Sequence, residues 1–99
     1  MKYSYELSEL AKLDLEDIWI YTVKRWSLNQ ANEYYELIID EIIEICKNPQ
    51  LGKSIERIKK LHRLRKIKSH LIIYKIDNKT VYVNRILHKK MEINSKLNE

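Results

Sequence analysis

Residues 63–93, RLRKIKSHLIIYKIDNKTVYVNRILHKKMEI, decide the fold that this sequence predicts. The stretch is dense in Ile, Val and Tyr, and such β-branched and aromatic side chains fit the pleated, half-buried surface of a sheet. Asp77-Asn78-Lys79 separates two apolar runs and predicts a tight hairpin turn. The stretch therefore predicts two or three antiparallel strands followed by a short basic helix.

Within this region, residues 70–76 are apolar at both alternating sets of positions, which predicts a central strand with both faces covered. The preceding run, residues 61–67, alternates poorly and is rich in charge. We therefore expect it at the edge of the sheet with its charges in water. Lys68-Ser69 allows a sharp reversal between the two runs, and residues 88–97, HKKMEINSKL, predict the terminal helix.

Upstream of the sheet, YSYEL at residues 3–7 alternates with a period of two and predicts a short strand with one buried face. Ser8 is a candidate N-cap for a helix that follows at once. Its core-facing stripe recurs every three or four residues and comprises Ala11, Leu15, Ile18, Thr22 and Trp26.

A second helix is predicted over about residues 28–47. Ser27 and Gln30 form a capping-box pattern at its start, and Pro49 ends it by disfavouring helix at the preceding residue. Because few residues separate the two helices, we expect an antiparallel hairpin lying on the sheet. The apolar arc of the second helix either packs against both the first helix and the sheet, or leaves part of its width open for a partner; it is widened by Leu37, Ile39 and Ile43.

Gly52 is the only glycine and follows Pro49 in a predicted turn, where we expect a positive φ because glycine adopts that region at no steric cost. Residues 53–68 then hold eight basic residues and one acidic residue. This segment is predicted as a basic connection into the sheet.

At 99 residues, the chain has room for one sheet and two or three helices, so we expect a single domain over residues 1–99. The lone Cys46 excludes an internal disulfide and indicates a reducing compartment. The N-terminus lacks the apolar core of a signal peptide, and no run approaches the roughly 20 apolar residues of a membrane span. We therefore expect a cytoplasmic protein that makes no use of a membrane.

The net charge of +5 conceals an asymmetry between the two halves of the chain. Residues 1–50 hold five Lys or Arg against ten Asp or Glu, whereas residues 51–99 hold fourteen against four. This polarity predicts an acidic partner for the second half: nucleic acid, an acidic protein surface, or each in turn. The simpler interpretation is a lysine-rich surface that keeps the protein in solution.

Several kinds of chemistry are not expected. One glycine cannot build a phosphate-binding loop, so no nucleotide cofactor is predicted. His62, His70 and His88 lack acidic or thiol neighbours at the spacing of a metal site, so no metal is predicted. A nucleophilic triad has no evident member, because Ser8 and Ser27 are predicted helix caps.

The candidate binding residues are basic and aromatic side chains that antiparallel pairing could bring onto a common surface: Arg63, Arg65, Lys66, His70, Tyr74, Arg85, His88, Lys89 and Lys90. Such a surface can position phosphates and, in a nuclease, stabilise developing charge and transfer protons. In the simpler interpretation, His70 and Tyr74 are core residues with satisfied polar ends. Arg85, if buried, needs an acidic partner, and Asp14 on the first helix is the candidate.

Taken together, these segments resemble ParE toxins of the ParE/RelE superfamily, the toxic half of type II toxin-antitoxin modules. The resemblance covers almost the whole chain and is carried by LSELAKLDLEDIWIYT at residues 7–22, Ala31 with Tyr34, Pro49 with Gly52, Arg63, SHLIIYKI at residues 69–76 and RILHKKMEI at residues 85–93. It implies an α+β fold in the order β-α-α-β-β-β, with the helical hairpin packed on an antiparallel sheet and a short C-terminal helix.

The resemblance also implies a ParD-like antitoxin that covers the toxin in a hetero-oligomer and contacts operator DNA through its own N-terminal part. ParE toxins poison DNA gyrase, whereas RelE-type relatives cut mRNA on the ribosome with basic residues and an acid/base side chain near the end of the last strand. No Tyr follows Tyr82 here, which favours gyrase inhibition by binding over catalysis. The alternative is a ribosome-dependent mRNA endoribonuclease that uses Arg65, Arg85 and His88. A third possibility is a toxin that retains only antitoxin binding.

Overall fold

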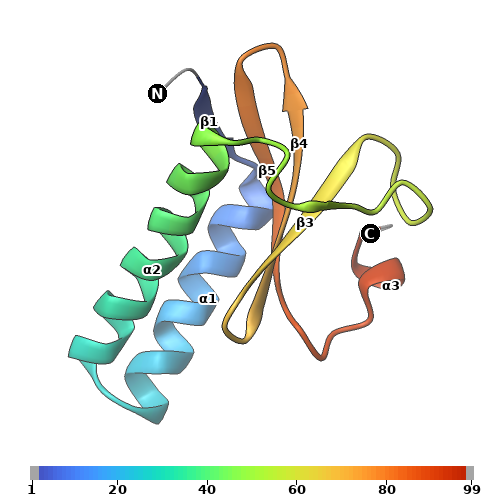
Figure 1. Ribbon diagram of the computed structural model, residues 1–99. Helices are drawn as coiled ribbons and strands as arrows, with labels where there is room; N and C mark the ends of the chain where they lie inside the picture. The colour runs from blue at the N-terminus through green and yellow to red at the C-terminus, as the bar shows by residue number, and fades with distance from the viewer. Residues whose placement is uncertain (1–2, 98–99) are drawn as a thin grey trace.

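The structure is a computed structural model that describes residues 3–97 (Figure 1). Five strands form one sheet in the order β1-β5-β4-β3-β2. A hairpin of two long helices covers one face of the sheet, and a short helix lies against the other face (Figure 1). The predicted α+β architecture is confirmed. In chain order the elements are β1 Ser4–Leu7, α1 Glu9–Arg25, α2 Leu28–Lys47, β2 Lys53–Ser54, β3 His62–Ile67, β4 His70–Asp77, β5 Thr80–His88 and α3 Ile93–Leu97.

β1 pairs in parallel with β5, from Ser4 opposite Thr80 to Leu7 opposite Val83. The other strand pairs are antiparallel. The first strand therefore lies beside the last one, an arrangement that nothing in the local sequence pattern predicts.

Both long helices begin where the sequence predicts. The Ser8 side chain accepts a hydrogen bond from the Ala11 N–H, and the Ser27 side chain accepts one from the Gln30 N–H. The expected core stripe of α1 fails at its last member, because Trp26 is 63% exposed. This residue is the C-cap of the helix, with a non-helical backbone, so the helical periodicity no longer places its side chain.

Two hairpin turns contain non-glycine residues with positive φ, Lys68 at 53° and Asn78 at 57°. Both lie where reversals are predicted. Gly52, in contrast, does not have a positive φ. It is needed for space: a Cβ there would lie 2.7 Å from the Tyr74 hydroxyl oxygen, which accepts a hydrogen bond from the Gly52 N–H at 2.8 Å.

The sheet separates two apolar clusters, and β4 contributes to both. Ile72 and Tyr74 pack with the hairpin helices, whereas Leu71 and Ile73 pack on the opposite face with Ile55, Leu64, Leu87 and Leu97. The central position predicted for this strand is confirmed. The larger cluster includes Ala11, Leu15, Ile38, Ile42, Ile45, Cys46, Val81, Val83 and Ile86.

Two expectations at the margins of the sheet are wrong. β3 is not the edge strand, because the chain returns after α2 and adds the two-residue β2 outside it. The terminal helix is shorter than the expected residues 88–97, since His88 belongs to β5 and helix begins only at Ile93. Within residues 3–97, no helix combines the length and apolar character that crossing a bilayer requires.

A groove between the helical hairpin and the β3–β4 turn

An open groove of about 1110 Å³ lies between the α1–α2 hairpin and the adjacent end of the sheet. Ile18, Leu37 and Ile86 give it an apolar lining. Asp17 and Glu33 line it from the helices, and Lys68 and His88 line it from the sheet. The groove therefore offers apolar contacts together with side chains of both charge signs.

Tyr34 and His70 form a hydrogen-bonded pair in the groove, with 2.7 Å between the Tyr34 hydroxyl oxygen and His70 Nδ1. The same hydroxyl accepts a hydrogen bond from the Ser69 N–H at 3.3 Å and lies 3.5 Å from the Ile67 carbonyl oxygen, to which it can donate. Burial, together with the neighbouring His88, lowers the pKa of His70 to about 4. His70 is therefore neutral near pH 7.

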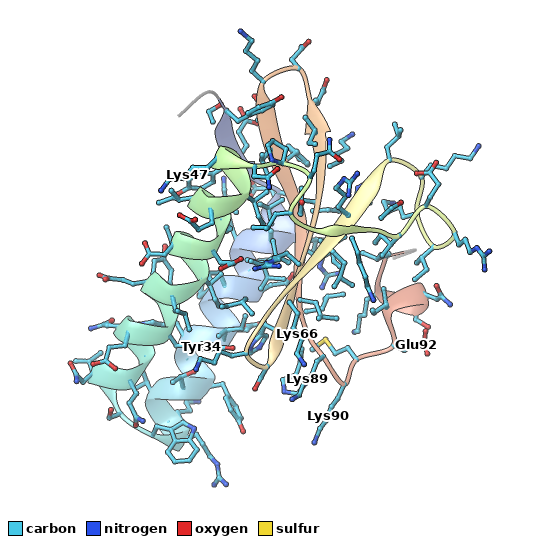
Figure 2. All side chains as sticks on the ribbon, viewed as in Figure 1. Tyr34, Lys47, Lys66, Lys89, Lys90 and Glu92 are labelled. Atoms are coloured by element: carbon cyan, nitrogen blue, oxygen red, sulfur yellow. The ribbon has the colours of Figure 1, made fainter. Side chains whose placement is uncertain are left out.

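His88 is the cross-strand partner of His70, and the two ring centroids lie 5.3 Å apart in an edge-on arrangement. The Lys90 N–H donates to His88 Nδ1 at 3.1 Å, which places the ring proton of neutral His88 on Nε2. Figure 2 shows Lys66, Lys89 and Lys90 near the same end of the molecule as Tyr34. The sheet side of the groove thus combines imidazole N–H donors with nearby ammonium groups.

Arg85 is only 8% exposed and lies against Asp14 of α1. Arg85 Nε lies 2.8 Å from Asp14 Oδ2, and Arg85 Nη2 lies 3.0 Å from Asp14 Oδ1. The predicted pairing is confirmed. A third arginine nitrogen, Nη1, donates to the Lys96 carbonyl at 3.2 Å, so Arg85 also contacts α3.

Asp14 lies beside the part of β5 that has no neighbouring strand on the β1 side. β1 ends opposite Val83, and beyond that point it no longer pairs with β5. The Asp14 carboxylate replaces the missing strand by accepting the Ile86 N–H at 2.9 Å. An irregularity in the β4–β5 pairing gives β5 an extra residue just before Arg85, and such bulges redirect side chains.

Two basic residues of β3 are also held within the fold. Arg65 forms an ion pair with Glu41 of α2, with 2.6 Å between Nε and Oε2. Arg63 donates to the Gly52 carbonyl at 2.6 Å and to the Gln50 side chain. Both guanidinium groups are therefore engaged within the fold, whereas the prediction of an edge strand placed these charges in water.

The nine candidate binding residues therefore do not share one surface. Tyr74 is fully buried, donating to the Pro49 carbonyl and accepting from the Gly52 N–H, as the simpler interpretation predicts. His70 and His88 come together in the groove, whereas Lys66, Lys89 and Lys90 are exposed.

Two partners of the candidate residues were not foreseen from the sequence: Tyr34, which contacts His70, and Glu41, which pairs with Arg65. Tyr34 has the spacing of an ordinary core residue, and its phenol was the only signal, because a half-buried hydroxyl requires a partner. Glu41 looks like one more residue on the polar side of α2. Only the folded sheet shows that it faces Arg65.

The family described as "ParE toxin of type II toxin-antitoxin system, parDE" matches residues 5–93 of the chain. The chain belongs to this ParE family. The matched range includes every residue that lines the groove, from Asp14 to Met91. In residues 3–97 of this ParE-family toxin, no three His, Cys, Asp or Glu side chains are grouped to hold a metal ion.

Curated relatives of this ParE chain include Toxin ParE1 of Mycobacterium tuberculosis, which is 32% identical over 98% of this chain and 100% of its own length. Toxin ParE1 of Caulobacter vibrioides is 33% identical over 94% of this chain and 96% of its own length.

Solved structures share the ParE fold at lower identity. The chromosomal ParDE TA system from P. aeruginosa matches with a TM-score of 0.77 at 15% identity, covering 88% of this chain and 96% of the other. The toxin-antitoxin complex RelBE2 from Mycobacterium tuberculosis matches with a TM-score of 0.70 at 16% identity, covering 90% and 100%.

Proposed function

We propose that this ParE-family toxin inhibits DNA gyrase by binding to it in the cytoplasm, and that a ParD-like antitoxin neutralises it in a hetero-oligomer. One observation supports binding over RNA cleavage. Arg65 and Arg85, which a nuclease of this fold would use on its substrate, are each paired with a helix carboxylate. A guanidinium committed to a carboxylate in the free toxin is poorly placed to stabilise a phosphate that arrives later.

The groove is the proposed antitoxin site. The two structural neighbours are described as toxin-antitoxin systems, which supports a partner of this kind here. Apolar anchors of the antitoxin would contact the Ile18 and Leu37 side of the groove, and its carboxylates would contact Lys68, which lines the groove, and the exposed Lys89 and Lys90 that follow His88. Operator DNA is contacted only through the antitoxin in this proposal.

A supercoiling assay with purified gyrase tests the target. The toxin is expected to inhibit supercoiling and trap cleaved DNA, and prior addition of the antitoxin encoded beside it should restore activity. Gyrase that remains fully active at saturating toxin would contradict the proposal.

The antitoxin site is tested separately by titrating antitoxin into two variants. Met91 lines the groove and is 44% exposed, so Met91→Glu should weaken antitoxin binding by about tenfold. Leu13 is 54% exposed on α1 but does not line the groove, so Leu13→Glu serves as the matched control. Equal affinity of both variants would place the antitoxin elsewhere.

A second candidate function, cleavage of mRNA on the ribosome, is favoured by the Tyr34–His70–His88 cluster. Two imidazoles in one groove can act as acid and base, and His88 is partly exposed. Primer extension on mRNA from induced cells distinguishes the candidates. New 5′ ends that disappear with His88→Ala would establish the nuclease, whereas intact message with DNA damage supports gyrase inhibition.

A further inference from the structure

The loop over residues 55–61, which joins β2 to β3, holds two apolar side chains out in water. Leu61 is 76% exposed and Ile58 is 36% exposed. Leu61 also has a φ of 66°, a left-handed conformation that is sterically unfavourable for a side chain with a Cβ. The stability of the fold does not account for a leucine at position 61, because its side chain packs in no apolar cluster and its backbone conformation is unfavourable for leucine.

The loop is nevertheless held in place by specific contacts. Ile55 is buried in the second apolar cluster, and its carbonyl accepts hydrogen bonds from the Ile58 and Lys59 N–H groups. The Glu56 carboxylate accepts the Leu61 N–H at 2.7 Å. The Lys59 ammonium donates to the Leu97 carbonyl at 3.4 Å, which joins the loop to α3. The exposed leucine is therefore presented by an organised segment, and preorganisation favours binding.

The charges around these apolar tips are mainly positive. Arg57 and Lys60 are exposed on this loop, and Lys53 is exposed on the adjoining β2. The one acidic side chain of the loop, Glu56, accepts the Leu61 N–H. A cationic rim around apolar tips is complementary to an acidic protein surface with an apolar recess. Nucleic acid would match the charge but offers no recess for a leucine, so a protein partner fits better.

This loop and the groove lie on opposite sides of the sheet. The groove faces the hairpin helices, whereas the loop extends near α3 on the side away from them (Figure 1). Neither Leu61 nor Ile58 lines the groove. A partner on the loop would therefore leave the groove accessible.

We propose that residues 55–61 form the surface with which this toxin binds its target protein, with Leu61 inserted into an apolar recess on an acidic face. The identification of the target as DNA gyrase rests on the proposed function. The choice of this loop as the binding surface rests only on its exposed apolar tips and its charges.

The decisive variant is Leu61→Asn, because Asn tolerates a positive φ and so removes the apolar tip without straining the loop. We expect it to bind purified gyrase about tenfold more weakly than wild type. Its thermal midpoint and its affinity for the antitoxin should be unchanged. Leu13→Gln, which alters an exposed leucine on α1, should retain wild-type affinity for gyrase.

Charge reversal provides a second test. The double variant Arg57→Glu/Lys60→Glu should weaken gyrase binding and make the remaining affinity less sensitive to salt. Lys79→Glu in the β4–β5 turn is the matched control for an exposed cation elsewhere.

The following outcomes separate the inference from the proposed function. If wild type binds gyrase and both loop variants bind equally well, the inference fails while the proposed function stands. If wild type does not bind gyrase, the proposed function fails, and growth arrest decides the inference. If the Leu61→Asn variant still binds the antitoxin but no longer arrests growth, the loop is supported as the target-binding surface. If this variant arrests growth fully, the inference is overturned. If the loop variants lose as much affinity for a DNA duplex as they lose for gyrase, the loop is a nucleic-acid contact, and the inference is overturned.

Discussion

Asp14 joins three elements of the fold through one carboxylate. It accepts hydrogen bonds from the Arg85 guanidinium and from the Ile86 backbone, and Arg85 in turn donates to the Lys96 carbonyl. The two side chains of the pair are only 14% and 9% exposed, so water cannot replace either partner readily. One interaction therefore connects α1, β5 and α3.

Arg85→Met is expected to lower the free energy of unfolding by about 3–5 kcal/mol, because it leaves the Asp14 charge largely buried without a counter-ion. Lys12→Met, which removes the exposed ion pair with Glu9, should change stability by less than about 1 kcal/mol. Urea denaturation at pH 7 measures both. Similar losses for the two variants would show that the inner pair is solvated.

His70 makes stability depend on pH. Its pKa is about 4 in the folded protein and near 6.5 in the unfolded chain, so the unfolded state binds more protons between these values. The stabilisation from neutral His70 is thus complete above pH 6.5 and is lost as the pH falls toward 4. His70→Gln should reduce this loss by up to about 2 kcal/mol between pH 4.5 and 7, because the half-buried ring is partly screened by water; the measurement is the free energy of unfolding at both pH values. An unchanged pH profile would contradict the assignment.

At the scale of elements, features set by neighbouring residues are predictable and features set by distant residues are not. The two serine caps and the turns at Lys68 and Asn78 follow from local chemistry. The role of Gly52 does not, because the constraint comes from Tyr74, 22 residues away in the sequence. For the same reason the pairing of Arg65 with Glu41 and the parallel contact of β1 with β5 could not be foreseen.

The two caps also differ in what they join. Ser27 caps α2 only, whereas Ser8 caps α1 and donates to the Asn84 carbonyl of β5. Ser27→Ala should therefore cost about 1 kcal/mol and Ser8→Ala about 2 kcal/mol, compared by urea denaturation under one set of conditions. If Ser8→Ala costs no more than Ser27→Ala, its contact with β5 contributes nothing to stability.

Across the whole molecule, the acidic first half and the basic second half partly neutralise each other through Asp14 with Arg85 and Glu41 with Arg65. The sequence alone suggests Arg63 and Arg65 as contacts for an acidic partner, but both hold the fold together. The cations left for a partner near the groove are exposed lysines, which no sequence pattern distinguishes from a solvated surface.

Lys89→Glu/Lys90→Glu is accordingly expected to weaken antitoxin binding by about tenfold and to reduce its dependence on salt. The measurement is a titration at two ionic strengths, with wild-type stability confirmed by thermal denaturation. Lys79→Glu, at the opposite end of β5, should leave affinity and salt dependence unaltered. The same loss in this control would indicate a general charge effect.

The parallel pairing of residues 4–7 with residues 80–83 also bears on how the toxin is made. Translation proceeds from the N-terminus, so the first strand emerges long before the strand beside which it must lie. The sheet stays incomplete until synthesis is nearly finished. Until residues 80–83 have emerged, residues 4–7 have no neighbouring strand to pair with, so the nascent chain carries an unpaired strand whose backbone hydrogen-bonding groups are open to other chains.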